Sequence, residues 1–460
     1  MIFKEQYITD LLDEAVTVSS AAIDVILNKA ERFEGLTHQE TAALLMTSNP
    51  QHISRMYAIA EKIKQHIYGE RIVVFAPLYV SDYCINGCSY CGFRHNNIVP
   101  RRKLTQAEVE TEVKILEKMG HKRIALEAGE DPENCPLDYI LECIDTIYRK
   151  SDIRRVNVNI AALSTEDFKQ LKDAQIGTYI LFQETYHRSS YEKVHISGPK
   201  ADFDYHLTAF DRAMEAKIDD VGAGVLFGLY DYKFEVLALM LHNEYLEKQF
   251  GVGFHTVSVP RLRSIDSTAE SNKTESDASV SDEDFLKLVA IIRMAVPFTG
   301  MIVSTRESPE IRRKLIQTGI SQMSAGSSTV VGGYSALTEK EDSVNNETTK
   351  QFSLADHRKP SEIYYWLMEE KILPSFCTAC YRSGRSGDRF MSLAKSGEIK
   401  NVCLPNGLLT LMEYSLDFGD ERFKYLAEKL IDEKLSQMNN TAQIEQKLKQ
   451  LKNGERDLFV

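Results

Sequence analysis

The 460-residue sequence lacks features that mark several common functional classes. No run of 18 apolar residues is present that could cross a membrane as a helix. The first residues, MIFKEQYITDLLDE, have neither the basic start nor the apolar core of a secretory signal peptide. Acidic residues outnumber basic ones, 67 to 55, and the net charge of -12 argues against a general binder of nucleic acid or membrane surfaces. We therefore expect a cytoplasmic protein with neither nucleic acid nor a membrane as a partner.

Cysteine is also scarce, with eight residues in the chain. In a reducing compartment these cysteines do not indicate a disulfide framework. Three of them form the pattern Cys84-x3-Cys88-x2-Cys91. At about 1.7% cysteine, roughly 0.003 such triplets are expected by chance, so the spacing indicates a site for an inorganic group. The others are an interior pair, interpreted as packing residues, and a C-terminal set: Cys135 and Cys143, then Cys377, Cys380 and Cys403.

Apolar, β-branched runs alternate with capped helical segments after the first ~70 residues, which read as helices. Eight strands with helices between them predict a parallel (β/α)8 barrel of the TIM type, with a doubly wound open sheet as the alternative. The expected strands are 71–80, 122–128, 154–160, 178–182, 221–227, 254–259, 300–305 and 320–326. The expected parts are an N-terminal helical extension (1–70), the barrel (71–335), a linker (336–351) and a mostly helical C-terminal domain (352–460), and polar residues 264–284 are expected to form a loop.

The cysteine triplet follows the first expected strand, at the carboxyl rim where barrel enzymes place their chemistry. Three thiolates in eight residues can hold one face of an iron–sulfur cube or supply part of a zinc site. A structural zinc ion needs a fourth ligand from elsewhere in the chain. Gly87 and Gly92 suit a loop that bends closely around an inorganic core. A barrel stabilised by zinc or by a redox-inactive cluster stays open as an alternative.

With Tyr90 before the last cysteine, the triplet resembles the signature of the radical S-adenosylmethionine (SAM) superfamily. The resemblance implies that the three cysteines hold a 4Fe–4S cluster whose fourth iron binds the amino and carboxylate groups of SAM. One electron from the cluster then cleaves SAM to methionine and a 5′-deoxyadenosyl radical. The protein's own part is to leave one iron without a protein ligand, tune the potential and exclude water.

Two further stretches resemble superfamily motifs at the expected strand ends. EAGEDP (127–132) resembles the GGE motif that receives the SAM amino group, with alanine in place of the first glycine. GVLFGLYD (224–231) resembles the G-x-I-x-G-x-x-E segment near adenine, but has leucine for isoleucine and aspartate for glutamate. FQETY (182–186) ends the fourth strand and could reach the ribose or methionine end. The resemblance thus implies these SAM-binding residues: Tyr90, Glu130, Gln183, Glu184, Gly224 and Gly228.

Within the superfamily, residues of about 70 to 335 resemble the tyrosine lyase branch, which contains 2-iminoacetate synthase and an [FeFe]-hydrogenase maturase. The stretches that carry this similarity are LEAGEDP, FQETYH, VSVPRLR and STRESPEIRR. The branch implies L-tyrosine as substrate, with cleavage of its Cα–Cβ bond to p-cresol and dehydroglycine. An amino acid needs a carboxylate clamp, which arginine with a hydroxyl neighbour supplies. We expect Arg306 in this role, assisted by Ser304 or Ser324, with Arg188, Arg261 and Arg263 as competitors.

The C-terminal pattern Cys377-x2-Cys380-x22-Cys403 resembles the maturase side of this branch. The resemblance implies a second 4Fe–4S cluster carrying an extra labile iron, with His255 as a ligand of that iron. There dehydroglycine would yield carbon monoxide and cyanide, captured as an Fe(CO)(CN) synthon for hydrogenase assembly. Free cysteine at this iron and other hydrogenase maturation proteins as synthon acceptors are the implied partners. A thiamine-pathway 2-iminoacetate synthase with structural C-terminal cysteines, and a non-enzymatic iron carrier, remain the alternatives.

Overall fold

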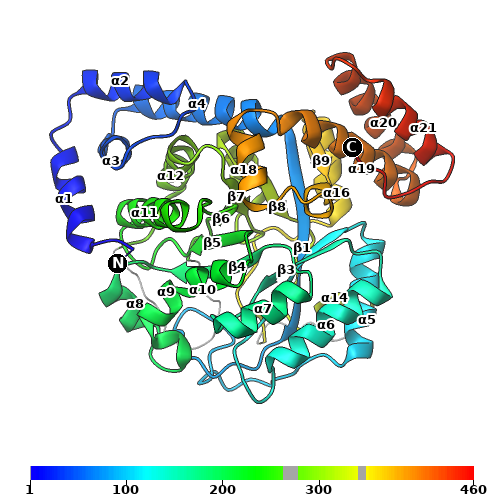
Figure 1. Cartoon of the computed structure of the whole chain (residues 1–460), viewed down its shortest axis with the longest axis horizontal. Coiled ribbons are helices and arrows are strands. Elements are labelled where there is room, and N and C mark those ends of the chain that lie inside the picture. The colour runs from blue at the N-terminus through cyan, green and yellow to red at the C-terminus, as the bar shows by residue number, and fades with distance from the viewer. Residues whose placement is uncertain (1, 263–277, 340–348) are drawn as a thin grey trace.

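A closed barrel of eight parallel strands forms the centre of the computed structural model, which describes residues 2–262, 278–339 and 349–460 (Figure 1). The strands follow one another around the barrel, and β1 pairs with both β2 and β8. The closure confirms the predicted (β/α)8 fold and shows that the open-sheet alternative was wrong. The barrel strands are β1 (Arg71–Ser81), β2 (Arg123–Ala128), β3 (Arg155–Asn159), β4 (Tyr179–Glu184), β5 (Val221–Val225), β6 (Thr256–Ser258), β7 (Gly300–Val303) and β8 (Gln322–Ser324).

Helices surround the barrel, and several begin at the caps that the sequence predicts. Thr105 and Glu108 form a capping box before α5, while Ser164 and Ser308 accept a backbone N–H at the starts of α7 and α13. The outer helices are α5 (Gln106–Lys118), α6 (Leu137–Lys150), α7 (Thr165–Asp173), α8 (Arg188–Val194), α9 (Phe203–Leu207), α10 (Ala209–Glu215), α11 (Tyr232–Phe250), α12 (Asp282–Ala295) and α13 (Pro309–Thr318), with a 3-10 turn at Pro199–Ala201. Most of the loop expected at 264–284 lies outside the described residues, and its end already belongs to α12.

Four helices precede the barrel, as expected, and pack against its helical layer. α4 lies along α12, and α3 contacts α11 and α12. This extension appears in blue at the upper left of Figure 1. Its helices are α1 (Glu5–Ala15), α2 (Ser20–Ala30), α3 (His38–Met46) and α4 (Pro50–Tyr68).

The C-terminal part is attached to the amino end of the barrel by a ninth strand that the sequence analysis did not expect. β9 (Leu373–Ser375) pairs in parallel with the first residues of β1, so that Arg71 lies opposite Leu373. The next residues therefore begin at the end of the barrel opposite the cysteine loop. The remaining helices are α14 (Gly333–Glu339), α16 (Pro360–Glu369), α17 (Ala379–Arg382), α18 (Gly387–Lys395), α19 (Lys400–Phe418), α20 (Glu421–Ser436) and α21 (Ala442–Lys452).

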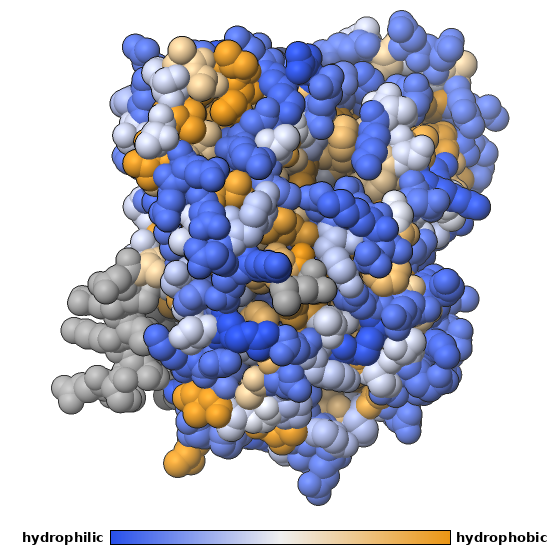
Figure 2. All heavy atoms as spheres, turned by 60° about the vertical axis from the view of Figure 1, so that its left-hand side comes forward, coloured by the Kyte–Doolittle hydropathy of each residue, from blue (hydrophilic) through white to orange (hydrophobic). Residues whose placement is uncertain are grey.

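Apolar side chains are concentrated inside the barrel and between its helices. Nearly every residue of β1 is buried, which a strand with neighbours on both sides and helices outside requires. The face in Figure 2 is mostly hydrophilic, with small separate apolar groups. Among the described residues, no helix is long and apolar enough to cross a membrane.

Candidate functional site: two cysteine clusters at opposite ends of the barrel

The cysteine loop that follows β1 is held in place by one arginine. The guanidinium of Arg101 donates to the backbone carbonyls of Asp82 at 2.9 Å, Phe93 at 3.0 Å, Arg94 at 2.7 Å and Asn97 at 3.0 Å. These carbonyls lie before and after the three cysteines. A planar group with five donors can gather several carbonyls that would otherwise be unpaired. Arg101 therefore fixes the shape of the loop without touching a cysteine sulfur.

Three glycines allow neighbouring segments to approach this loop. A Cβ on Gly87 would lie 2.6 Å from Ser197 Oγ, and one on Gly92 would lie 2.0 Å from the Lys350 carbonyl oxygen. Gly129, in the AGE motif, would meet the Tyr83 carbonyl at 2.3 Å. The glycines thus make room for protein segments that pack on the loop. That Gly87 and Gly92 also let the loop bend around an inorganic core stays a prediction.

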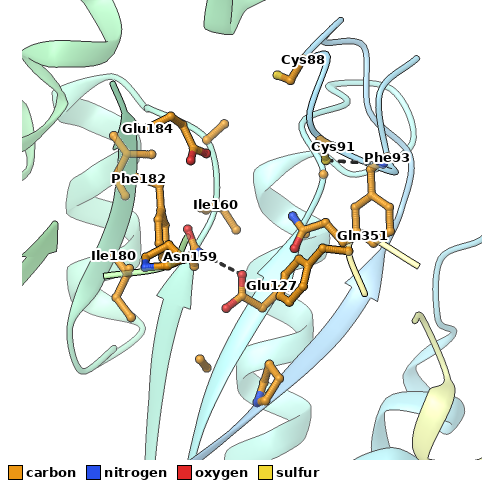
Figure 3. Close-up of a pocket in the computed structure, with 18 of the residues that line it drawn as sticks. Cys88, Cys91, Phe93, Glu127, Asn159, Ile160, Ile180, Phe182, Glu184 and Gln351 are labelled. Carbon is orange, nitrogen blue, oxygen red and sulfur yellow. Dashed lines mark hydrogen bonds between the residues drawn. The ribbon is translucent and has the colours of Figure 1, made fainter. Parts of the chain in front are cut away.

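A cavity of about 220 Å³ extends from the cysteine loop into the barrel (Figure 3). It brings together nine of the predicted site residues: Cys84, Cys88, Cys91, Tyr90, Glu130, Glu184, Ser304, Arg306 and Ser324. Gln183 does not line it, because its side chain is buried and turns back towards the Thr185 carbonyl at 3.5 Å. Gly224 and Gly228 are also absent from its lining. Gly224 still matters for its shape, since a Cβ there would lie 2.1 Å from the ring of Phe182, which lines the cavity.

The carboxylates near the cysteine loop are held by polar neighbours. Asn86 Nδ2 donates to Glu130 Oε2 at 2.5 Å, while Asn86 Oδ1 accepts the Lys200 N–H at 2.9 Å. Burial raises the pKa of Glu130, against the opposing effects of Asn86 and Lys200. Lys200 Nζ lies 2.9 Å from Glu184 Oε1, and Glu184 adopts a φ of +67°. A non-glycine residue in this left-handed region is strained, and such strain is concentrated at functional sites.

The thiols of the loop lie in surroundings that disfavour charge. Burial raises the pKa of Cys88 to about 12 and that of Cys91 to about 11, with Lys200 the cation that opposes the shift. Cys91 Sγ accepts the Phe93 N–H at 3.4 Å. Metal binding requires the thiolate, so a bound cation must supply the stabilisation that the protein does not. Three thiols on one wall of a cavity, with space beside them, fit an iron–sulfur cluster that keeps one side open.

Arg306, Ser304 and Ser324 meet on the side of the cavity formed by β7 and β8. Burial lowers the pKa of Arg306, whose guanidinium lies 3.5 Å from the ring centroid of Phe352. Ser304 Oγ accepts the Arg306 N–H at 3.3 Å, and Ser324 Oγ accepts the Thr305 N–H at 3.2 Å. Within the described residues Arg306 forms no ion pair with a carboxylate, which leaves its cationic group available to an anionic ligand.

Of the three other arginines considered for the carboxylate clamp, two form ion pairs with carboxylates and one lies outside the described residues. Arg261 is buried against Glu307, with Nε at 3.0 Å from Oε1, and also pairs with Asp282. Arg188 pairs with Asp204 in an exposed position. Arg263 lies outside the described residues. Of the described candidates, Arg306 is therefore the one that faces the cavity.

A second, smaller cavity of about 50 Å³ lies at the amino end of the barrel, where β9 joins β1. It brings together the other four predicted metal ligands: Cys377, Cys380, Cys403 and His255. Cys377 follows β9, Cys380 lies on α17 and Cys403 lies on α19. His255 immediately precedes β6, which places it at the amino end of the strands.

Arginines line this second cavity. Arg71 Nη2 donates to Cys403 Sγ at 3.0 Å, and Arg123 Nη2 donates to the Cys377 carbonyl at 2.9 Å. Hydrogen bonds from Cys380 and Arg71 lower the pKa of Cys403, despite its burial. A hydrogen bond with Cys403 and burial raise the pKa of Cys380, and burial raises that of Cys377. Arg71 therefore stabilises thiolate charge at Cys403, which suits an anionic cluster.

His255 has the properties of a free metal ligand. Burial lowers its pKa, so the imidazole is neutral at physiological pH. Among the described residues its buried Nδ1 has no hydrogen-bond partner, and it lies 3.6 Å from Asp220 Oδ1. Buried polar atoms of this kind normally have partners, so an unpaired ring nitrogen in a cysteine-lined cavity fits an added metal ion.

Within the described residues, no group of three or more His, Cys, Asp or Glu side chains is arranged to hold a single metal ion. The cysteine sulfurs of an iron–sulfur cluster bind different irons, so they stand farther apart than the ligands of one ion. Both cysteine sets therefore fit a cluster better than the closed four-ligand zinc site considered from the sequence.

Several residues of the two cavities were missed by sequence reasoning. In the first these include Asn86, Lys200, Gln351 and Phe352, and in the second Arg71 and Arg123. Lys200 and Asn86 come from turns with no motif of their own, and Arg71 reads as an ordinary charged residue before a strand.

Gln351 lay at the end of the expected linker. In the structure its carbonyl accepts the Gly92 N–H at 2.8 Å, and its side-chain oxygen accepts the Tyr79 hydroxyl at 2.7 Å. Gln351 therefore connects the cysteine loop with β1 in the cavity wall.

A parallel barrel with a three-cysteine loop at its carboxyl rim is the arrangement of radical SAM enzymes. The chain matches the radical SAM superfamily over residues 78–241 and the biotin and thiamin synthesis associated domain over residues 258–372. These two matches cover the barrel and the start of the C-terminal part. The chain is therefore a radical SAM enzyme, and this family implies a 4Fe–4S cluster and SAM.

Comparison with solved structures narrows this class. The chain is 53% identical to a crystal structure of HydG, a maturase of the [FeFe]-hydrogenase, with a TM-score of 0.94 and full coverage of both chains. It is 38% identical to the HydG of Carboxydothermus hydrogenoformans, with a TM-score of 0.85 and 97% coverage of both chains. The chain belongs to the HydG family of [FeFe]-hydrogenase maturases.

A more distant relative covers less of the chain. The 2-iminoacetate synthase of Salmonella typhimurium is 29% identical over 358 residues, which are 77% of this chain and 90% of that enzyme. The HydG structure that is 53% identical spans the whole chain, including the C-terminal cysteines.

Proposed function

We propose that the protein is a radical SAM tyrosine lyase of hydrogenase maturation that works in the cytoplasm. It would cleave the Cα–Cβ bond of L-tyrosine to p-cresol and dehydroglycine, and convert dehydroglycine to carbon monoxide and cyanide. The observation that carries this proposal is the pair of cysteine-lined cavities at opposite ends of one barrel. Membership of the HydG family supports it, because those relatives are hydrogenase maturases.

In the first cavity Cys84, Cys88 and Cys91 would hold the 4Fe–4S cluster, and Glu130 would receive the amino group of SAM. When bound, cluster and SAM together supply a radical able to abstract hydrogen from the substrate amino group. Tyr90, Glu184 and Lys200 surround the space beside the cysteines. Because Lys200 pairs with Glu184, this wall carries little net charge towards a cationic cofactor.

The chain's own residues would orient the amino acid. Arg306 would bind the substrate carboxylate, and Ser304 or Ser324 would donate a hydroxyl hydrogen bond to it. The Phe352 ring holds the guanidinium in position through their close contact. Gln351 and Phe352 line the cavity and would help to exclude water from the reacting groups.

At the amino end of the barrel Cys377, Cys380 and Cys403 would hold the auxiliary 4Fe–4S cluster, and His255 the extra labile iron. Arg71 and Arg123 would neutralise the negative charge of that cluster. Iron carrying carbon monoxide and cyanide would leave as the synthon for H-cluster assembly. Free cysteine at this iron and other hydrogenase maturation proteins as acceptors complete the proposal. The corresponding domains are 1–70, 71–335, 336–351 and 352–460.

The second candidate is a 2-iminoacetate synthase of thiamine biosynthesis, which the similarity to the Salmonella enzyme favours. In that case the C-terminal cysteines would be structural. The buried, unpaired His255 Nδ1 among these cysteines supports the maturase instead.

Anaerobic reconstitution with iron and sulfide, followed by L-tyrosine, SAM and dithionite, tests the proposal. We expect p-cresol, cyanide and carbon monoxide together. Formation of p-cresol without either diatomic product would favour the synthase. If no p-cresol forms while SAM is cleaved, the tyrosine lyase proposal is wrong.

A further inference from the structure

A polar pair lies deep in the first cavity, below the cysteine loop, and the proposed function gives it no role. Asn159 Nδ2 donates to Glu127 Oε2 at 2.7 Å. Strand register explains the pairing, because Tyr79 of β1 lies opposite Glu127 of β2, which lies opposite Asn159 of β3. All three line the cavity, and Figure 3 shows Glu127 and Asn159 facing each other at some distance from Cys88 and Cys91.

The pair is polar within mostly apolar surroundings. The cavity wall near it includes Ile160, Ile180 and Phe182 (Figure 3). Within the described parts of the chain, the other oxygen of Glu127, Oε1, has no hydrogen-bond partner. Burial raises the pKa of Glu127 to about 8, against the opposing hydrogen bond from Asn159. At neutral pH the side chain is mainly a neutral acid, which can both donate and accept a hydrogen bond.

Glu127 and Asn159 lie on the opposite side of the barrel from Arg306. In the closed strand order, β2 and β3 lie across the barrel from β6 and β7. Arg306 follows β7, whereas Glu127 is the last residue but one of β2 and Asn159 is the last residue of β3. A ligand that binds Arg306 through a carboxylate and extends across the barrel therefore directs its far end at Glu127.

We propose that Glu127 and Asn159 recognise the phenol hydroxyl of the substrate and so restrict the enzyme to 4-hydroxyphenyl amino acids. This inference rests on the proposed function, since it takes tyrosine as the ligand. The phenol O–H hydrogen bonds with Glu127, whose carboxyl group Asn159 holds in position. A phenylalanine ring in the same place would leave a buried carboxyl group without a partner. Sites built to bond a substrate hydroxyl reject the analogue that lacks it for this reason.

Equilibrium dialysis of radiolabelled L-tyrosine and L-phenylalanine against the reconstituted enzyme with SAM tests this inference. We expect the wild type to prefer tyrosine by at least about 100-fold, and Glu127→Leu to reduce that preference at least about tenfold. Glu127→Gln should keep most of it, because an amide also bonds a phenol. Asn159→Leu should reduce it by a smaller factor, because the carboxyl group loses its positioning donor.

Glu112→Gln is the matched control. Glu112 is a buried carboxylate on α5 that accepts the Tyr334 N–H at 3.0 Å and lies outside the cavity lining. Its substitution should leave the preference unchanged. Equal binding of the two amino acids by the wild type would overturn the inference even if the leucine variant does not fold. A folded Glu127→Leu enzyme with the wild-type preference would overturn it as well. Release of p-cresol, measured in parallel, tests the lyase activity separately, so failure of the proposed function is distinguishable.

Discussion

The two cysteine sets occupy opposite ends of one barrel and differ in the charge that the protein places around them. At the carboxyl end burial raises the pKa values of Cys88 and Cys91, and the cation near them, Lys200, is paired with Glu184. At the amino end Arg71 donates to Cys403 and helps to lower its pKa.

The difference matches what each site would hold in the proposed function. SAM carries a positive sulfonium group, and the pairing of Lys200 with Glu184 offsets the positive charge beside Cys88 and Cys91 that would repel it. The second site has to stabilise a negative cluster without such a cofactor, and its arginines do so. Each site has three cysteines, but the cation beside the first set is paired with a carboxylate, whereas arginines donate hydrogen bonds to the second set.

Replacing Arg101 by methionine should break the first site alone. The variant loses four hydrogen bonds from a charged donor to the cysteine loop, which cost several kcal/mol in total at about 1.5–3 kcal/mol each. We expect SAM cleavage to fall at least about 100-fold, because the loop no longer presents three cysteines together. The C-terminal cysteines of this variant should still bind iron, which Mössbauer spectroscopy can measure.

Arg102→Met is the control for this prediction. Arg102 is the next residue in the chain, but its guanidinium pairs with Glu108 at 2.6 Å on the surface. Exposed pairs of this kind contribute little, so this variant should cleave SAM nearly as well as the wild type. Equal behaviour of the two variants would contradict the role given to Arg101.

Replacing Arg71 by methionine should damage the second site while sparing the first. Cys403 loses its guanidinium donor, and the cluster loses a neutralising charge. We expect carbon monoxide formation to fall about tenfold or more, as for a lost charge-assisted hydrogen bond, while p-cresol formation persists. Gas analysis and p-cresol assay of the same reaction provide the measurement. Parallel loss of both products would show that Arg71 serves the fold as a whole.

The smallest expected effect is a difference in thiol reactivity between the two sites, which reports directly on the charge around each cysteine. The hydrogen bond from Arg71 favours the thiolate of Cys403, whereas burial raises the pKa of Cys91 and keeps its thiol protonated at pH 8. In cluster-free protein at pH 8, methyl methanethiosulfonate should therefore modify Cys403 faster than Cys91, although Cys403 is the more buried. Raising the pH towards 10 should narrow the gap, because Cys91 then begins to ionise. Peptide mass spectrometry measures both sites, and faster modification of Cys91 at pH 8 would contradict the assignment.

The barrel could be predicted from the sequence because each strand carries a run of β-branched or apolar residues between capped helices. β9 could not, since a three-residue strand with a central proline has no periodicity and exists through its pairing with Arg71, Ile72 and Val73. Spacing alone singled out Cys84, Cys88 and Cys91, because spacing is a local property. The assignment of Cys377, Cys380, Cys403 and His255 came from resemblance to a family and stays a prediction.

The supporting residues were harder to predict because their roles arise from tertiary contacts. Arg71 and Cys403 are 332 positions apart, and their contact depends on β9 and α19 meeting the start of β1. Phe352 and Arg306 meet because the segment after the expected linker returns to the cavity. Glu127 reads as part of a SAM motif, and its inward direction follows from strand register.

The central claim is that the two ends of the barrel perform separable steps, and a Cys377→Ser, Cys380→Ser double variant tests it most directly. After anaerobic reconstitution with L-tyrosine, SAM and dithionite, the variant should still release p-cresol, because the cavity that holds Arg306 is intact. It should form no carbon monoxide. Carbon monoxide at the wild-type level from this variant would contradict the account.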